Sequence, residues 1–69
     1  MIPEPIRQIA IQHGKDFRVD KNSPSWIING YHNKIDDRMK QQIEEKGFTI
    51  TEEHDFSYGF SQYYYQFNN

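Results

Sequence analysis

One arrangement of residues occurs twice along this 69-residue chain and limits the folds open to it. Isoleucines at helical spacing lead to Gly14 and to Gly47, and a Phe-x-Val or Phe-x-Ile segment of alternating polarity follows each glycine. A polar turn and an aromatic-rich strand pattern complete each copy. The pattern predicts an α+β fold of one domain over residues 1–69, in the order αββαββ. We expect a four-stranded, mostly antiparallel sheet with both helices on one face, and a pseudo-repeat of pattern only.

The first helix is expected over residues 4–13. Pro5 and Glu4 suit a first helical turn, and Gly14 is a natural residue to end the helix. The residues expected on its core-facing stripe are Ile2, Ile6, Ile9, Ala10 and His13. Ile11 lies off this stripe, which is one sign of a second apolar surface.

The second helix is expected over residues 33–46. Asn33 is a good N-cap residue, and Asp36 three positions later resembles a capping box. Gly47 ends the helix, and Phe48 supplies the apolar contact that accompanies such ends. The residues expected on its apolar stripe are Ile35, Met39, Ile43 and Lys46.

Each helix is followed by a predicted hairpin. Residues 16–29 form the first, with Phe17 and Val19 alternating with polar neighbours. The second has strands over residues 48–53 and 60–67, joined by a loop over residues 54–59. In its last strand, alternation places Tyr63, Tyr65 and Phe67 towards the core and Tyr64 on the open face.

A winged helix-turn-helix is the alternative architecture. In it, Ser23 caps a short helix over residues 24–30, residues 33–46 form the DNA-reading helix, and residues 48–67 form the wing. The run Trp26-Ile27-Ile28 is better strand material than helix material, so a strand at residues 24–30 favours the αββαββ fold.

The composition excludes several classes of protein. The chain has no cysteine, so it has no disulfide framework and no thiolate chemistry. It has no apolar run of membrane-spanning length and no signal-peptide pattern, and we expect a cytoplasmic protein. It also has no leucine, and isoleucine and eleven aromatic residues supply its apolar surface. So short a chain has a thin margin of stability, and a homodimer is left open.

No constellation of residues indicates catalysis. The residues His13, His32 and His54 are too far apart in sequence for a metal motif. The adjacent carboxylate pairs do not face each other as glycosidase chemistry requires. No nucleophile elbow and no glycine-rich phosphate loop is found. We therefore predict that the chain is not an enzyme and needs neither metal nor cofactor.

Charge is distributed unevenly along the chain. All eight lysines and arginines lie at or before Lys46, whereas the last 23 residues contain three carboxylates and no cation. Since contacts to phosphate dominate affinity for nucleic acid, an acidic wing argues against DNA binding. The net charge of −2 gives no attraction to anionic lipid either.

The acidic and aromatic second hairpin is the most distinctive surface. Exposed aromatic residues beside carboxylates are typical of protein-binding patches. We therefore predict a small, soluble, non-catalytic protein-binding module, an inhibitor or regulator of the kind encoded by mobile elements. The alternatives are a winged-helix transcription regulator and a homo-oligomeric structural protein. The predicted partner-binding residues are Glu52, Glu53, Asp55, Phe56, Tyr58 and Tyr64.

Overall fold

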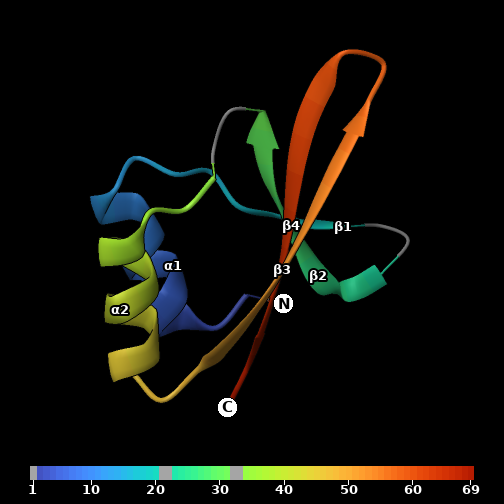
Figure 1. The fold of residues 1–69 in the computed structure, drawn as a ribbon. Coiled ribbons are helices and arrows are strands. Elements are labelled where there is room, and N and C mark those ends of the chain that lie inside the picture. Colours follow the sequence, from blue (N-terminus) through green and yellow to red (C-terminus); the bar gives the residue numbers. More distant parts are fainter. Residues whose placement is uncertain (1, 21–22, 32–33) are drawn as a thin grey trace.

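A computed structural model describes residues 2–20, 23–31 and 34–69, with only the backbone described for residues 20 and 23–31. The elements in chain order are α1 (Glu4–Gln12), β1 (Arg18–Asp20), β2 (Ser23–Tyr31), α2 (Asp37–Glu45), β3 (Thr49–Ser57) and β4 (Phe60–Asn68) (Figure 1). The α+β class predicted from the sequence is confirmed.

The strands lie in the order β1-β2-β4-β3, and neighbours are antiparallel. The β3–β4 pairing is regular from Thr49–Asn68 to Ser57–Phe60, whereas the other two pairings contain shifts of register. β1 has only three residues. The long and regular part of the sheet is therefore the β3–β4 hairpin.

Residues 24–30, which separate the two architectures expected from the sequence, lie in a strand. β2 covers Ser23–Tyr31 and pairs with β4 through Ile27–Tyr65 and Ile28–Tyr64. The short helix of the winged helix-turn-helix alternative is therefore wrong. The β-branched and aromatic side chains of this segment favour a strand over a helix.

The α1 helix agrees closely with its prediction. Pro5 lies in its first turn, and the chain leaves the helix through Gly14 at a positive φ of 68°. A residue in this left-handed conformation is the usual way to end a helix, and glycine adopts it without steric cost. Ile6, Ile9 and Ala10 are buried as the stripe predicted.

The α2 helix begins later than predicted, and its cap is Asp36. The Asp36 carboxylate accepts a hydrogen bond of 2.8 Å from the Met39 backbone N–H. The predicted cap, Asn33, lies outside the described residues. A carboxylate three positions before Met39 satisfies a free N–H of the first turn, so the helix begins at Asp37.

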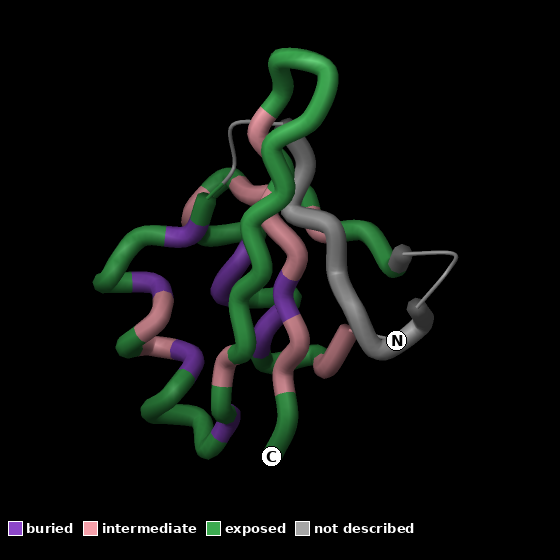
Figure 2. The backbone as a smooth tube through the Cα atoms, turned by 45° about the vertical axis from the view of Figure 1, so that its right-hand side comes forward, coloured by how far each residue is buried: buried purple, intermediate pink, exposed green. Residues whose placement is uncertain are grey.

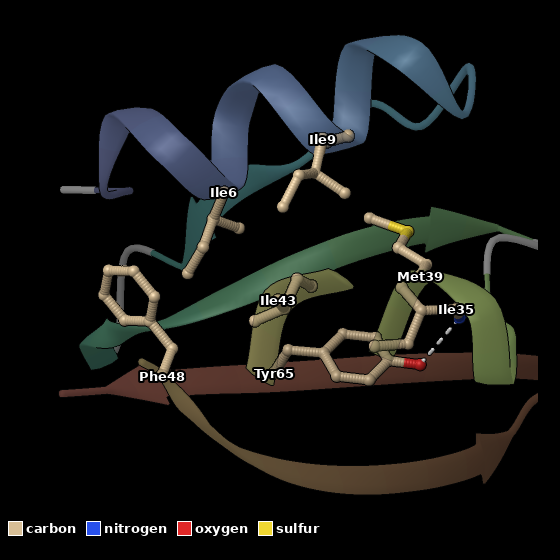
Figure 3. Packing of buried hydrophobic residues seen from close by; sticks show 8 residues of the cluster. Ile6, Ile9, Ile35, Met39, Ile43, Phe48 and Tyr65 are labelled. Carbon is tan, nitrogen blue, oxygen red and sulfur yellow. Dashed lines mark hydrogen bonds between the residues drawn. The ribbon is translucent and has the colours of Figure 1, made fainter. Parts of the chain in front are cut away.

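The core lies between the two helices and the side of the sheet that carries Tyr65 (Figure 3). Its buried residues are Ile6, Ile9, Ala10, Ile35, Met39, Ile43, Phe48 and Tyr65. Phe17, Ile50, Tyr63 and Phe67 are partly buried against them. Isoleucines from the helices therefore pack on aromatic rings from the sheet.

Val19 departs from the alternation expected in the first hairpin. Phe17 packs on the core, but Val19 is exposed. β1 is an outer strand of three residues, and its register with β2 shifts directly after Val19. So short a strand offers little neighbouring surface to cover the Val19 side chain.

Candidate functional site

The second hairpin ends in a turn of two residues, where a six-residue loop was predicted. β3 continues through Ser57, and only Tyr58 and Gly59 join it to β4, with φ angles of 54° and 78°. Two consecutive residues with positive φ are typical of the tight turn that matches the twist of a hairpin. Residues 54–57 are therefore free to pair with β4 as strand, and the predicted loop is wrong.

This hairpin projects beyond the rest of the molecule (Figures 1 and 2). The last described pair between β2 and β4 is Tyr31–Gln62, so, among the described residues, residues 56–61 pair only with each other. We call residues 56–61 the arm tip. In Figure 2 the end of the hairpin is exposed on both strands.

The arm tip carries three large apolar side chains that the fold does not bury. Phe56 is 68% exposed, Tyr58 is 95% exposed and Phe60 is 50% exposed. Single exposed apolar residues are ordinary, but here three occur within five positions at the end of a projection, with Phe56 and Phe60 on opposite faces of the hairpin. Aromatic residues of this kind anchor protein interfaces.

The register divides the predicted partner-binding residues between the two faces of the hairpin. Glu52 lies opposite Tyr65, whereas Glu53 lies opposite Tyr64. Directly paired residues share a face and successive residues alternate. Glu52 and Phe56 therefore lie on the face that carries the core. Glu53, Asp55 and Tyr64 lie on the opposite face, and Tyr58 lies in the turn.

Glu52 belongs to a network that joins the sheet to α2. The Tyr65 hydroxyl donates a hydrogen bond of 2.7 Å to Glu52 Oε1 and accepts one of 3.0 Å from the Ile35 N–H. Lys40 Nζ lies 3.8 Å from Glu52 Oε2. Burial of the phenol raises the pKa of Tyr65, and the hydrogen bond to Glu52 raises it further. Glu52 is thus paired with a cation within the fold, whereas Asp55 accepts a hydrogen bond of 3.5 Å from the Ser57 hydroxyl.

A stack of rings lies between this network and the arm tip. The His54 and Tyr63 rings are parallel, with centroids 4.4 Å apart, and Lys34 Nζ lies 5.5 Å from the centre of the Tyr63 ring. His54 lies opposite Tyr63 in the register. The core-side face of the hairpin is thus filled by contacts within the chain up to His54, and its free apolar surface begins at Phe56.

The two histidines that the structure describes, His13 and His54, have separate partners. His13 Nε2 lies 2.6 Å from Gln42 Oε1, which links the end of α1 to α2, and His54 is stacked on Tyr63. His32 lies outside the described residues. Within the part of the chain that the structure describes, no group of three histidines or carboxylates is arranged to hold a metal ion.

A hollow of about 390 Å³ lies beside α1. It is lined by Ile2, Arg7, Ala10, Ile11, Lys15, Asp16 and Phe17. Ile11, which lay off the helical stripe, is 60% exposed there. Its one carboxylate, Asp16, is paired with Arg18 at 3.0 Å, so the lining offers no pair of acidic groups for catalysis.

The sequence pattern predicts the aromatic residues of the hairpin but not the turn that brings them together. The signal was present, because Tyr58-Gly59 stands between two runs that alternate in polarity. A glycine in the second turn position was the cue, and the tyrosine before it obscured the cue since asparagine or aspartate is usual there.

Comparison of the chain with protein-family models, with curated proteins and with solved structures found no match. Neither α1 nor α2, the helices in the described residues, is long and apolar enough to cross a membrane.

Proposed function

We propose that the chain is a small, soluble, cytoplasmic module without catalytic activity, which binds another protein through the arm tip. The observation that carries this proposal is the conformation and exposure of Tyr58. The proposed contact consists of Phe56, Tyr58 and Phe60, with Glu53, Asp55 and Tyr64 on the adjoining open face.

The backbone conformation of Tyr58 is unfavourable for an aromatic residue. Its φ of 54° is a left-handed conformation that asparagine and glycine adopt more easily than an aromatic residue does. A strained backbone is a reason to look for function at that position. Its ring gains nearly no burial in return, since the side chain is 95% exposed. A partner that buries the ring would provide favourable free energy to offset the strain of the Tyr58 backbone.

The shape of the projecting β3–β4 hairpin suits a cleft in the partner. A projection of two strands that ends in aromatic side chains can enter a cleft more deeply than a flat sheet face can. This geometry supports the further proposal that the module acts as an inhibitor or regulator of that partner. We also propose, from the order of the strands and of the elements, that the four strands act as one sheet and that the order αββαββ is a pseudo-repeat.

A photocrosslinking amino acid placed at Tyr58 tests the contact in a lysate of the source organism. We expect a crosslinked protein from position 58 and none from Gln41, an exposed position on α2 that serves as the matched control. The Phe56→Ala variant should weaken capture of the same protein. Equal crosslinking from both positions, or undiminished capture by Phe56→Ala, would contradict the proposal.

The two alternative functions make different predictions. A DNA-binding regulator would bind oligonucleotides with an affinity that falls as salt rises. A homo-oligomeric structural protein would change its sedimentation with its own concentration. We expect neither result for the purified chain at micromolar concentration.

A further inference from the structure

The free edge of β3 is a second recognition feature of the hairpin. β3 pairs with β4 on one side and ends the strand order on the other. An edge strand presents backbone N–H and C=O groups that can pair with another chain. Natural edges are blunted by charged side chains, above all lysine, by proline, by bulges or by short length. Over its nine residues β3 has no proline, lysine or bulge, and its charged side chains are the carboxylates of Glu52, Glu53 and Asp55.

The turn determines which backbone groups face the free edge. In a two-residue turn the flanking residues, Ser57 and Phe60, exchange the first backbone hydrogen bonds. Hydrogen-bonded and non-hydrogen-bonded pairs then alternate along an antiparallel ladder. By this alternation, Glu52, His54 and Phe56 direct their N–H and C=O groups away from β4.

The half of this edge beyond Glu52 is the accessible half. α2 packs beside the beginning of β3, where Lys40 lies 3.8 Å from Glu52. From Glu53 to Ser57 every residue is exposed. The accessible edge therefore covers residues 53–57 and leads directly into the arm tip.

The charges along residues 53–57 indicate which kind of segment can bind to this edge. Glu53 and Asp55 are exposed on the same face, and neither takes part in an ion pair with any described residue. Residues 47–69 contain no lysine or arginine. Opposite charges on paired strands are favourable and like charges are unfavourable. A second copy that paired through residues 53–57 would oppose carboxylate to carboxylate, whereas a segment with cations at alternate positions would neutralise them.

We propose that residues 53–57 bind an extended, lysine- or arginine-bearing segment of a partner protein, which adds to the sheet as a strand beside β3. Backbone hydrogen bonds supply the affinity of such strand addition, and alternate side chains supply its specificity. The inference rests on the proposed function, because the same partner would contact the arm tip. It adds the chemical class of the bound segment.

The probe is a nine-residue peptide of alternating lysine and threonine, and its control has glutamate in place of lysine. Titration into the isotope-labelled chain, followed by amide NMR, should shift the amide signals of residues 52–57 with the lysine peptide. We expect at least tenfold weaker binding of the glutamate peptide. Reversal of both charges, with Glu53→Lys and Asp55→Lys, should reverse this preference.

A matched pair of variants tests the backbone contact itself. His54→Pro removes the outward N–H, and His54→Ala removes the same ring but keeps that N–H. Proline is tolerated on an edge strand where its nitrogen faces away from the ladder. We expect the lysine peptide to bind His54→Pro at least tenfold more weakly than His54→Ala. Methylation of alternate backbone nitrogens in the peptide should cause the same loss, whatever the stability of the protein variant.

Three results would overturn the inference. The first is equal binding of the lysine and glutamate peptides. The second is undiminished binding of the peptides methylated at either alternate set of backbone nitrogens, and the third is a concentration-dependent dimer that pairs through β3. Each leaves the proposed function standing if crosslinking from Tyr58 still succeeds. Conversely, binding of the lysine peptide at β3 without a crosslink from Tyr58 would refute only the role of the arm tip.

Discussion

Tyr65 and Glu52 lie directly opposite each other in the β3–β4 ladder, and the Tyr65 hydroxyl donates a hydrogen bond of 2.7 Å to Glu52 Oε1. The same hydroxyl accepts from the Ile35 N–H just before α2, as Figure 3 shows. One buried phenol thus joins β4, β3 and the segment that leads into α2. This junction fixes the base of the hairpin, from which the arm tip projects.

Removal of the hydroxyl should destabilise the fold. Tyr65→Phe keeps the ring in the core but leaves the buried Ile35 N–H without its acceptor, a loss that costs about 1–3 kcal/mol. Tyr65→Ala should cost more, about 3–5 kcal/mol, because a large cavity remains. Urea unfolding followed by circular dichroism measures both. Tyr58→Phe is the control and should change the free energy of unfolding by less than about 0.5 kcal/mol. A Tyr65→Phe variant as stable as the wild type would refute the junction.

The raised pKa of the Tyr65 phenol predicts that the protein loses stability in alkali. Burial raises the pKa of Tyr65 above its ordinary value of 10.0, so the folded state holds this proton more tightly than the unfolded state does. The stabilisation is complete below pH 10 and is lost as pH rises from there towards the pKa of the folded state. Unfolding in urea between pH 9 and about pH 12 should therefore show a steeper decline for the wild type than for Tyr65→Phe. Parallel curves for the two proteins would contradict this prediction.

The two adjacent glutamates should respond differently to substitution. Glu52→Ala removes an acceptor that a buried hydroxyl uses and should cost about 1–2 kcal/mol, whereas Glu53→Ala should lie within about 0.5 kcal/mol of the wild type. Chemical denaturation of both variants measures the difference. Loss of partner binding by Glu53→Ala alone would then report recognition, and a similar loss by Glu52→Ala would report a disturbed fold as well. Equal stabilities would show that Glu52 has no structural role.

The cap of α2 gives a prediction that tests the observed start of the helix. Asp36→Ala removes the acceptor of the Met39 N–H and should cost about 1 kcal/mol, within a range of about 0.5–2 kcal/mol. Asp37→Asn, its neighbour in the first turn, loses only an interaction with the helix dipole and should cost less, about 0.3–1 kcal/mol. Thermal unfolding of the two variants measures both losses of stability. A larger loss for Asp37→Asn than for Asp36→Ala would show that Asp36 is not the cap.

Periodic features of the sequence predicted the elements, and local polar contacts decided where the elements end. The stripes of Ile6, Ile9, Met39 and Ile43 depend on spacing alone, and all four residues are buried. The start of α2 depends on which carboxylate reaches the Met39 N–H, a choice that spacing does not make. The placement of Glu52 and Glu53 on different faces depends on register, which follows from the length of the turn. A loop of six residues predicted from composition left that register undefined.

The turn at the arm tip should show that stability and recognition favour different residues. Tyr58→Asn places a residue that tolerates positive φ where an aromatic residue is strained, so the variant should be more stable by about 0.5–1 kcal/mol. It also removes the most exposed aromatic ring of the arm tip, so capture of the partner should weaken at least tenfold. Gly59→Ala is the matched control, since it adds strain at a φ of 78° while leaving every aromatic side chain in place. It should lower the free energy of unfolding by about 1 kcal/mol and bind the partner within about threefold of the wild type. A Tyr58→Asn variant that gains stability and keeps full binding would mean that the partner does not contact this ring.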